Sequence, residues 1–159
     1  MATPLIRPCD GCRKCCYTHA VATPEGKVTE AFAWCKLCSD HGCSVHATDL
    51  QPYLCQQWHC AWQEGLGSEE ERPDKTNIVP EWRFTRQGRT LVLIEAMAGA
   101  LESEYGKALA SEYARRRIPQ LHVFHNGRKR LIFERDIIVD ASLMRQAQKE
   151  NVEIVFVDT

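Results

Sequence analysis

Residues 9–16 read Cys-Asp-Gly-Cys-Arg-Lys-Cys-Cys and open the stretch of sequence that decides the fold. Two more thiol-rich segments follow, C-K-L-C-S-D-H-G-C at residues 35–43 and C-Q-Q-W-H-C at residues 55–60. All nine cysteines of the chain lie between Cys9 and Cys60. We therefore expect the first part of the chain to be organised by its thiols.

Composition narrows the classes of protein that this sequence fits. The 159 residues carry 20 Lys and Arg against 21 Asp and Glu, so there is no basic excess of the kind that nucleic-acid binders show. We find neither the apolar run of a signal peptide nor a run long enough to span a membrane. The sequence thus predicts a cytoplasmic protein without a membrane or nucleic-acid partner, and it leaves a protein partner open.

The reducing cytoplasm determines how the cysteines are interpreted. Thiols stay reduced there, so a dense set at short spacing favours metal binding over disulfides. The odd count of nine would also leave one thiol over in any complete disulfide pairing. A metal ion is therefore the expected partner of these side chains.

The distribution of periodicity predicts an α+β fold with two different halves. Residues 9–62 lack sustained helical or strand periodicity and are interrupted by Gly and Pro. Residues 1–63 are therefore expected to form an irregular metal-binding lobe, with helical turns after Cys15 and within residues 48–57. Residues 64–79 form an acidic connector. Residues 80–159 are expected to form a small, mostly antiparallel sheet with two helices, packed against the lobe.

The second half predicts its elements in the order β-β-α-β-β-α-β. Asn126-Gly127 is the strongest hairpin signal and is typical of a type I′ turn. Pro119 ends the first helix, and Asp140 can cap the second. The expected strands cover residues 81–85, 90–95, 121–125, 130–134 and 152–157, and the expected helices cover residues 100–117 and 140–150.

The spacing of the thiols is typical of metal sites. Two cysteines separated by two residues can present both sulfurs to one ion across a tight turn, and Gly11 can adopt the positive φ that such a turn needs. In an extended segment Cys15 and Cys16 would point to opposite faces, which favours two four-cysteine sites over one. Thiolates suit both zinc and iron, so the metal stays open between zinc, iron and an iron–sulfur cluster.

The same residues resemble a known family. The stretch from Cys9 to Lys75 resembles the YkgJ-type cysteine-cluster family of zinc- or iron-chelating proteins, whose pattern begins C-x-x-C-x-x-C-C and ends C-x-W. Trp62 and the trailing Arg72-Pro73-Asp74-Lys75 also fit this pattern. What the resemblance implies is metal binding, without a reaction. The implied metal ligands are Cys9, Cys12, Cys15, Cys16, Cys35, Cys43, Cys55 and Cys60.

The chain also departs from the family pattern. Cys38 replaces a leucine and His46 a tyrosine, while Gln51 and Gln56 stand where arginines are expected. Whether Cys38, His46 or His59 is a ligand is left open. No motif covers residues 78–159.

Three functions remain open at this point. The first is a metal-binding protein in which zinc or iron is mainly structural, with Trp58 and Trp62 excluding water from the site. The second is an iron–sulfur protein with redox or group-transfer activity. The third is a metal-delivery or protein-interaction module.

Overall fold

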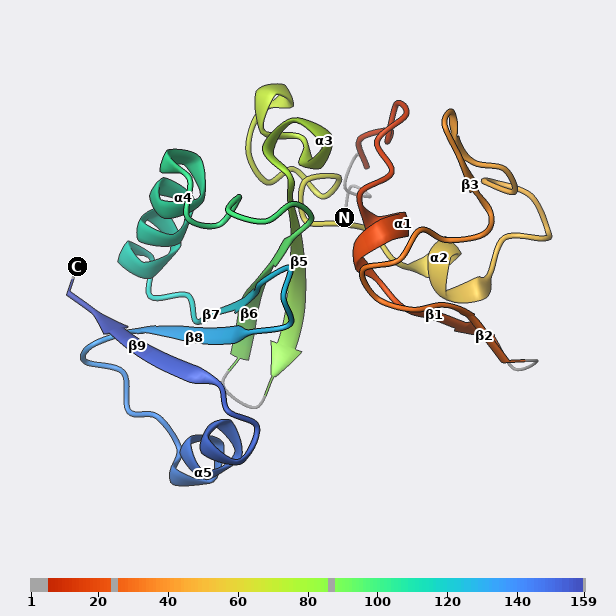
Figure 1. Cartoon of the computed structure of the whole chain (residues 1–159). Helices are drawn as coiled ribbons and strands as arrows, with labels where there is room; N and C mark the ends of the chain where they lie inside the picture. Colours follow the sequence, from red (N-terminus) through yellow and green to blue (C-terminus); the bar gives the residue numbers. More distant parts are fainter. Residues whose placement is uncertain (1–5, 24–25, 86–87, 159) are drawn as a thin grey trace, which may run out of the picture. The chain divides into compact units, whose positions relative to one another are not determined.

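The computed structural model describes residues 6–23, 26–85 and 88–158. The chain divides into two compact units, Met1–Val79 and Pro80–Thr159. Figure 1 follows the chain through helices and strands of both units. In the described part of the chain, no helix is long and apolar enough to cross a membrane.

The first unit is built from short elements joined by turns. Its irregularity follows from the Gly, Pro and Cys content, which supplies turns in place of periodic apolar faces. The two helical turns expected after Cys15 and within residues 48–57 are confirmed. The elements are α1 (Cys15–Thr18), β1 (Val21–Thr23), β2 (Gly26–Thr29), β3 (Cys38–Ser39), β4 (Gly42–Cys43), α2 (Tyr53–Gln57), the 3-10 turn η1 (Glu69–Glu71) and α3 (Pro73–Thr76).

The stretch expected to be a connector, residues 64–79, belongs to the first unit and has local structure of its own. A capping box starts η1: the Ser68 side chain accepts from the backbone of Glu71, and the Glu71 carboxylate accepts the Ser68 N–H at 2.5 Å. Pro73 opens α3, and Asn77 ends it in the left-handed conformation with φ of 58°. Glu71 therefore serves as a cap, and Glu70 pairs with Lys75.

The second unit has the element order that the sequence predicts, and the α+β class is confirmed. Its first strand, β5, begins at Ile78, two residues before the boundary between the units. The elements are β5 (Ile78–Thr85), β6 (Gly88–Glu95), α4 (Glu104–Arg115), β7 (Gln120–Val123), β8 (Lys129–Glu134), α5 (Ala141–Lys149) and β9 (Glu153–Val157), and the five strands are ordered β5-β6-β7-β8-β9 in one sheet.

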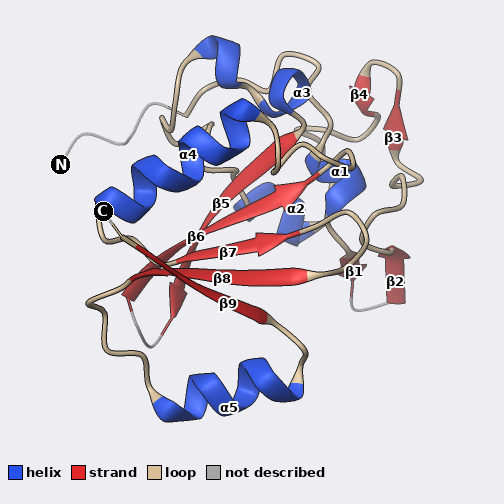
Figure 2. Cartoon of the chain, turned by 60° about the vertical axis from the view of Figure 1, so that its left-hand side comes forward, coloured by secondary structure: helices blue, strands red, loops and turns tan. Residues whose placement is uncertain are grey.

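Pairing directions in this sheet follow from the connections. Strands β7 and β8, joined by a short loop, pair antiparallel, as do β1–β2 and β3–β4 in the first unit. The pairs β6–β7 and β8–β9 are each joined through a helix and are parallel, so the large sheet is mixed. Right-handed crossovers between strands that run in opposite directions place their helices on opposite faces. Figure 2 shows α4 and α5 on opposite sides of the sheet.

The hairpin expected at Asn126-Gly127 is confirmed, but the type I′ turn is wrong. That turn needs positive φ at both residues, and only Gly127 has it, at 82°. The loop is longer than two residues: the Phe124 N–H donates to the Arg128 C=O at 2.8 Å, and the Gly127 N–H donates to the Phe124 C=O at 2.9 Å. The Asn126 side chain accepts the Arg128 N–H at 3.0 Å, a local bond that stabilises the wider loop.

Strand β6 forms the centre of the second unit's core. Leu91 and Leu93 are fully buried, and Phe133 of β8 is 1% exposed. The buried Glu95 carboxylate is paired: it accepts the Leu101 N–H at 3.1 Å and the His125 N–H at 2.9 Å. A continuous run of buried apolar residues in β6 is typical of a strand covered on both faces.

Candidate metal centre

Four of the nine cysteines line one small cavity in the first unit. We call Cys9, Cys12, Cys15 and Cys60 the first thiol group. The cavity has a volume of about 10 Å³, which is roughly the space of a single water-sized sphere. Its remaining walls come from Trp62, Gln63, Pro73 and Val79.

Short local turns bring the first thiol group together. The Cys12 N–H donates to the Cys9 C=O at 2.9 Å, and this turn uses positive φ at Asp10 (45°) and Gly11 (83°). The expectation for Gly11 is confirmed. Cys15 is the first residue of α1, and Cys60, which is buried, comes from the segment after α2. Residues more than forty positions apart thus face one cavity.

Several N–H groups point at the sulfurs of this group. The Gln63 side-chain amide donates to Cys9 Sγ at 3.1 Å. Backbone N–H groups of Lys14 and Asp74 donate to the Cys12 thiol, and those of Trp62 and Gln63 donate to the Cys60 thiol. A thiol is a weak acceptor, whereas an ionised sulfur is a strong one. The donor set therefore fits sulfur ligands in their thiolate form.

Burial opposes ionisation of these thiols in the chain alone. Burial, together with the charges of Cys60, Cys12 and Cys16, raises the pKa of Cys9 to about 11. The pKa values of Cys12 and Cys60 are also raised, mainly by burial. Bringing several thiolates together costs free energy because of desolvation and mutual repulsion. A metal cation would remove that cost by replacing the protons.

Trp62 covers the first thiol group from one side. The side chain is 1% exposed, its Nε1–H donates to the Ser68 C=O at 2.8 Å, and the Arg7 guanidinium lies 5.2 Å from the ring centre. The expected water-excluding role fits this position. Trp58 is placed differently, because its ring lies 4.5 Å from the His19 ring and does not line the cavity.

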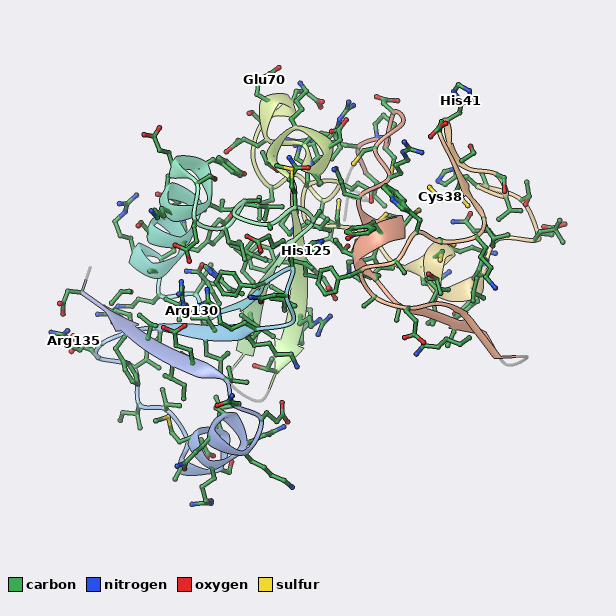
Figure 3. All side chains as sticks on the ribbon, viewed as in Figure 1. Cys38, His41, Glu70, His125, Arg130 and Arg135 are labelled. Carbon is green, nitrogen blue, oxygen red and sulfur yellow. The ribbon has the colours of Figure 1, made fainter. Side chains whose placement is uncertain are left out.

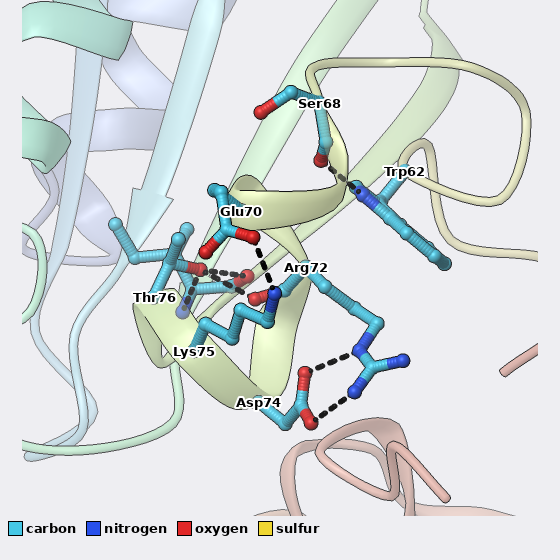
Figure 4. A network of polar contacts seen from close by, with 8 residues as sticks. Trp62, Ser68, Glu70, Arg72, Asp74, Lys75 and Thr76 are labelled. Carbon is cyan, nitrogen blue, oxygen red and sulfur yellow. Dashed lines mark hydrogen bonds and ion pairs between the residues drawn. The ribbon is translucent and has the colours of Figure 1, made fainter. Parts of the chain in front are cut away.

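The Arg72-Pro73-Asp74-Lys75 segment lies at the same group. Figure 4 shows the Arg72 guanidinium donating twice to the Asp74 carboxylate, at 2.7 and 2.9 Å, with Lys75 paired to Glu70 nearby. The hydrogen bond from Arg72 lowers the pKa of Asp74. Pro73 lines the cavity, and the charges of Arg72 and Asp74 both act on Cys12.

Sequence reasoning missed the position of these neighbours. It recognised the Arg72–Lys75 segment only as a motif that trails the cysteines, and it overlooked Gln63. The sequence does contain one indication for Gln63: it lies three residues after Cys60, a spacing at which its amide can fold back toward that cysteine. Nothing in the sequence indicates that Gln63 reaches Cys9, which lies 54 positions earlier.

The other thiols lie outside the walls of this cavity. We call Cys16, Cys35, Cys43 and Cys55 the second thiol group; they come from α1, the turn before β3, β4 and α2. The thiols of Cys16, Cys35 and Cys43 raise the pKa of Cys55 beyond the effect of its burial. Cys38 hydrogen-bonds with Cys16. Four of the eight predicted ligands therefore line the first cavity, and the other four include Cys55 and the three cysteines whose charges act on it.

The side chains of Cys15 and Cys16 point in different directions, but for a reason other than the one expected. They are consecutive residues of α1, not of an extended segment. On a helix neighbouring side chains point about 100° apart. Cys15 accordingly lines the first cavity, whereas Cys16 contacts Cys38, although the Cys15 and Cys16 thiols still hydrogen-bond to each other.

The histidines among the cysteines are not placed as ligands of the first thiol group. His46 donates its backbone N–H to the Cys43 C=O at 3.2 Å, and neither His46 nor His59 lines the cavity. Figure 3 shows His41 at the tip of the β3–β4 hairpin. Within residues 6–23, 26–85 and 88–158, all cysteines are free thiols and no group of three or more His, Cys, Asp or Glu has the arrangement of a formed metal site.

Comparison with known proteins adds no relative. No family model matches the chain, and neither a curated protein nor a solved structure matches it.

Proposed function

We propose that this chain is a metal-binding protein that holds zinc or iron through its cysteine cluster, with the metal mainly structural. The ligands are the eight cysteines of the two thiol groups. The observation that carries the proposal is the first thiol group: four thiols line one ion-sized cavity, and N–H groups donate to three of the sulfurs. The resemblance to the YkgJ-type family points the same way.

The donor set of the first group, four cysteines, has the number and type of ligands that a structural zinc site uses. The chemistry that a bound ion supplies here is a cross-link between segments with few apolar contacts of their own. Gln63 and the backbone N–H groups would orient the sulfurs and share their negative charge, while Trp62 would keep water away.

The metal most compatible with the cavity is a mononuclear ion. A cavity of about 10 Å³ lined by four thiols has room for one ion between them. The C-x-x-C-x-x-C run keeps an iron–sulfur cluster, with redox or group-transfer activity, as the alternative. Free thiols in this density suit the reducing cytoplasm, which we propose as the compartment.

Elemental analysis of protein purified under anaerobic conditions tests this proposal. We expect at least one zinc or iron per chain and the loss of one ion when Cys12 and Cys60 are both replaced by Ser. A colourless zinc-containing preparation agrees with a structural ion. Brown protein that absorbs near 400 nm would favour the iron–sulfur alternative, and metal content at the level of the buffer would overturn the proposal.

A further inference from the structure

The second thiol group has a framework of its own. The Cys35 N–H donates to the Cys16 C=O at 3.0 Å, which ties α1 to the turn before β3. The Cys38 N–H donates to the Cys35 C=O at 2.9 Å, and Cys38 is the cross-strand partner of Cys43. A C-x-x-C turn that leads into a tight hairpin thus carries Cys35 and Cys43 on one short, hydrogen-bonded segment.

Helix α2 brings the fourth thiol of this group. Cys55 lies in the middle of α2, and α2 contacts β1, the strand that follows α1. The end of α2 is also held near the end of α1, because the Trp58 and His19 rings lie 4.5 Å apart. Figure 3 shows further sulfur atoms beside the labelled Cys38. These contacts hold α2, which carries Cys55, beside β1 and the end of α1, and the charges of Cys16, Cys35 and Cys43 act on the Cys55 thiol.

A cation lies at this group. The Arg13 guanidinium donates to the Ser39 C=O at 2.5 Å and to the Asp40 carboxylate at 3.0 Å, and it stacks 5.0 Å from the Trp34 ring centre. The same guanidinium also hydrogen-bonds with the Cys38 thiol, which in turn hydrogen-bonds with Cys16. Four thiolates around a divalent ion leave two negative charges, and a fixed guanidinium partly offsets them.

We propose that Cys16, Cys35, Cys43 and Cys55 form a second metal centre, separate from the one at Cys9, Cys12, Cys15 and Cys60, so that the chain holds two thiophilic ions of the zinc class. This inference rests on the proposed metal binding and adds the number of centres and the ligands of each. The two centres adjoin at Cys15 and Cys16. Cys38 stands beside Cys16 as a fifth thiol that the second centre does not require.

Native mass spectrometry of the reduced, metal-free chain with added zinc tests this division. We expect two zinc ions in the wild type and in Cys38→Ser. Cys12→Ser and Cys60→Ser should each lose the ion of the first thiol group and keep the other ion. Cys35→Ser and Cys55→Ser should each lose the ion of the second thiol group and keep that of the first. Loss of an ion in Cys38→Ser would overturn the ligand set, and loss of all metal in every single variant would overturn the separation.

Cobalt(II) titration of the wild-type chain counts the metal centres without any substitution, so the result does not depend on whether a variant folds. Sulfur-to-cobalt charge-transfer absorbance should rise until two equivalents have been added. A break at one equivalent would overturn the second centre and leave the proposed function standing. Absence of any such absorbance would contradict the proposed function itself, so the two failures are distinguishable.

Discussion

His122 on β7 gives the second unit a pH dependence that can be measured separately from the thiols. The side chain is 2% exposed, and its Nε2 hydrogen-bonds with the Gln120 side-chain oxygen at 3.2 Å. Its Nδ1 has no hydrogen-bond partner among the described residues. Burial and, to a smaller extent, the charge of Arg130 lower the pKa of His122 to about 4, against the opposing charge of Glu102. The imidazole is therefore held neutral in the folded chain.

The sign and size of the effect follow from the two states. An unfolded His122 would take up its proton near pH 6.5 and the folded one only near pH 4, so the unfolded state binds more protons between these values. Stability is fully present above about pH 6.5 and is lost as the pH falls toward 4. The total loss amounts to about 3 kcal/mol, of which about 2 kcal/mol falls between pH 7 and pH 5.

Urea unfolding of the wild type and of His122→Gln at pH 7 and pH 5 measures this contribution. We expect the free energy of unfolding of the wild type to fall by about 2 kcal/mol more than that of the variant. Acid effects on the first unit are common to both chains and cancel in the comparison. His125→Gln is the matched control, since His125 follows β7 and is only partly buried, and it should keep the wild-type dependence. Equal losses in the wild type and in His122→Gln would refute the reasoning.

Two further substitutions test the site and the core. Gln63→Leu removes the amide that donates to Cys9 Sγ, so we expect the metal affinity measured by chelator competition to fall about 10- to 100-fold. The control Gln57→Leu, at the exposed end of α2, should leave the affinity unchanged. Equal affinities in the two variants would contradict the role of Gln63. Leu93→Ala opens a cavity in the core of β6 and should cost about 2–5 kcal/mol of unfolding free energy, while Ile138→Ala, at a 95% exposed position, should cost less than about 0.5 kcal/mol. Comparable losses at the two positions, measured by denaturant unfolding, would contradict the core assignment.

The element order of the second unit could be predicted because its signals are local. Apolar alternation, the Asn126-Gly127 pair and the helix-ending Pro119 act within a few residues. Pairing direction could not be obtained in the same way, because it depends on which strands become neighbours after each helix. The turn type at Asn126 was mispredicted since the Asn126 side chain caps the loop and stabilises a longer turn.

The candidate site shows the same limit. The family resemblance implied eight cysteine ligands; in the structure four of them line one cavity, and the charges of three of the others act on Cys55. Which thiol joins which group depends on contacts across many residues, such as Cys35 with Cys16, and spacing carries no such information. The contribution of Gln63, Arg72 and Asp74 is likewise created by folding, because each reaches a thiol that is distant in the sequence.

Removal of the metal by a chelator tests the central claim most directly. The readouts are amide hydrogen exchange and the reactivity of the thiols with a thiol reagent, in the full chain under anaerobic conditions. If metal bound by the thiols folds the first unit, amides between residues 9 and 62 lose protection and buried thiols such as Cys60 become reactive, while β6 to β8 stay protected. Unchanged protection and unchanged thiol reactivity after complete removal of the metal would contradict the account.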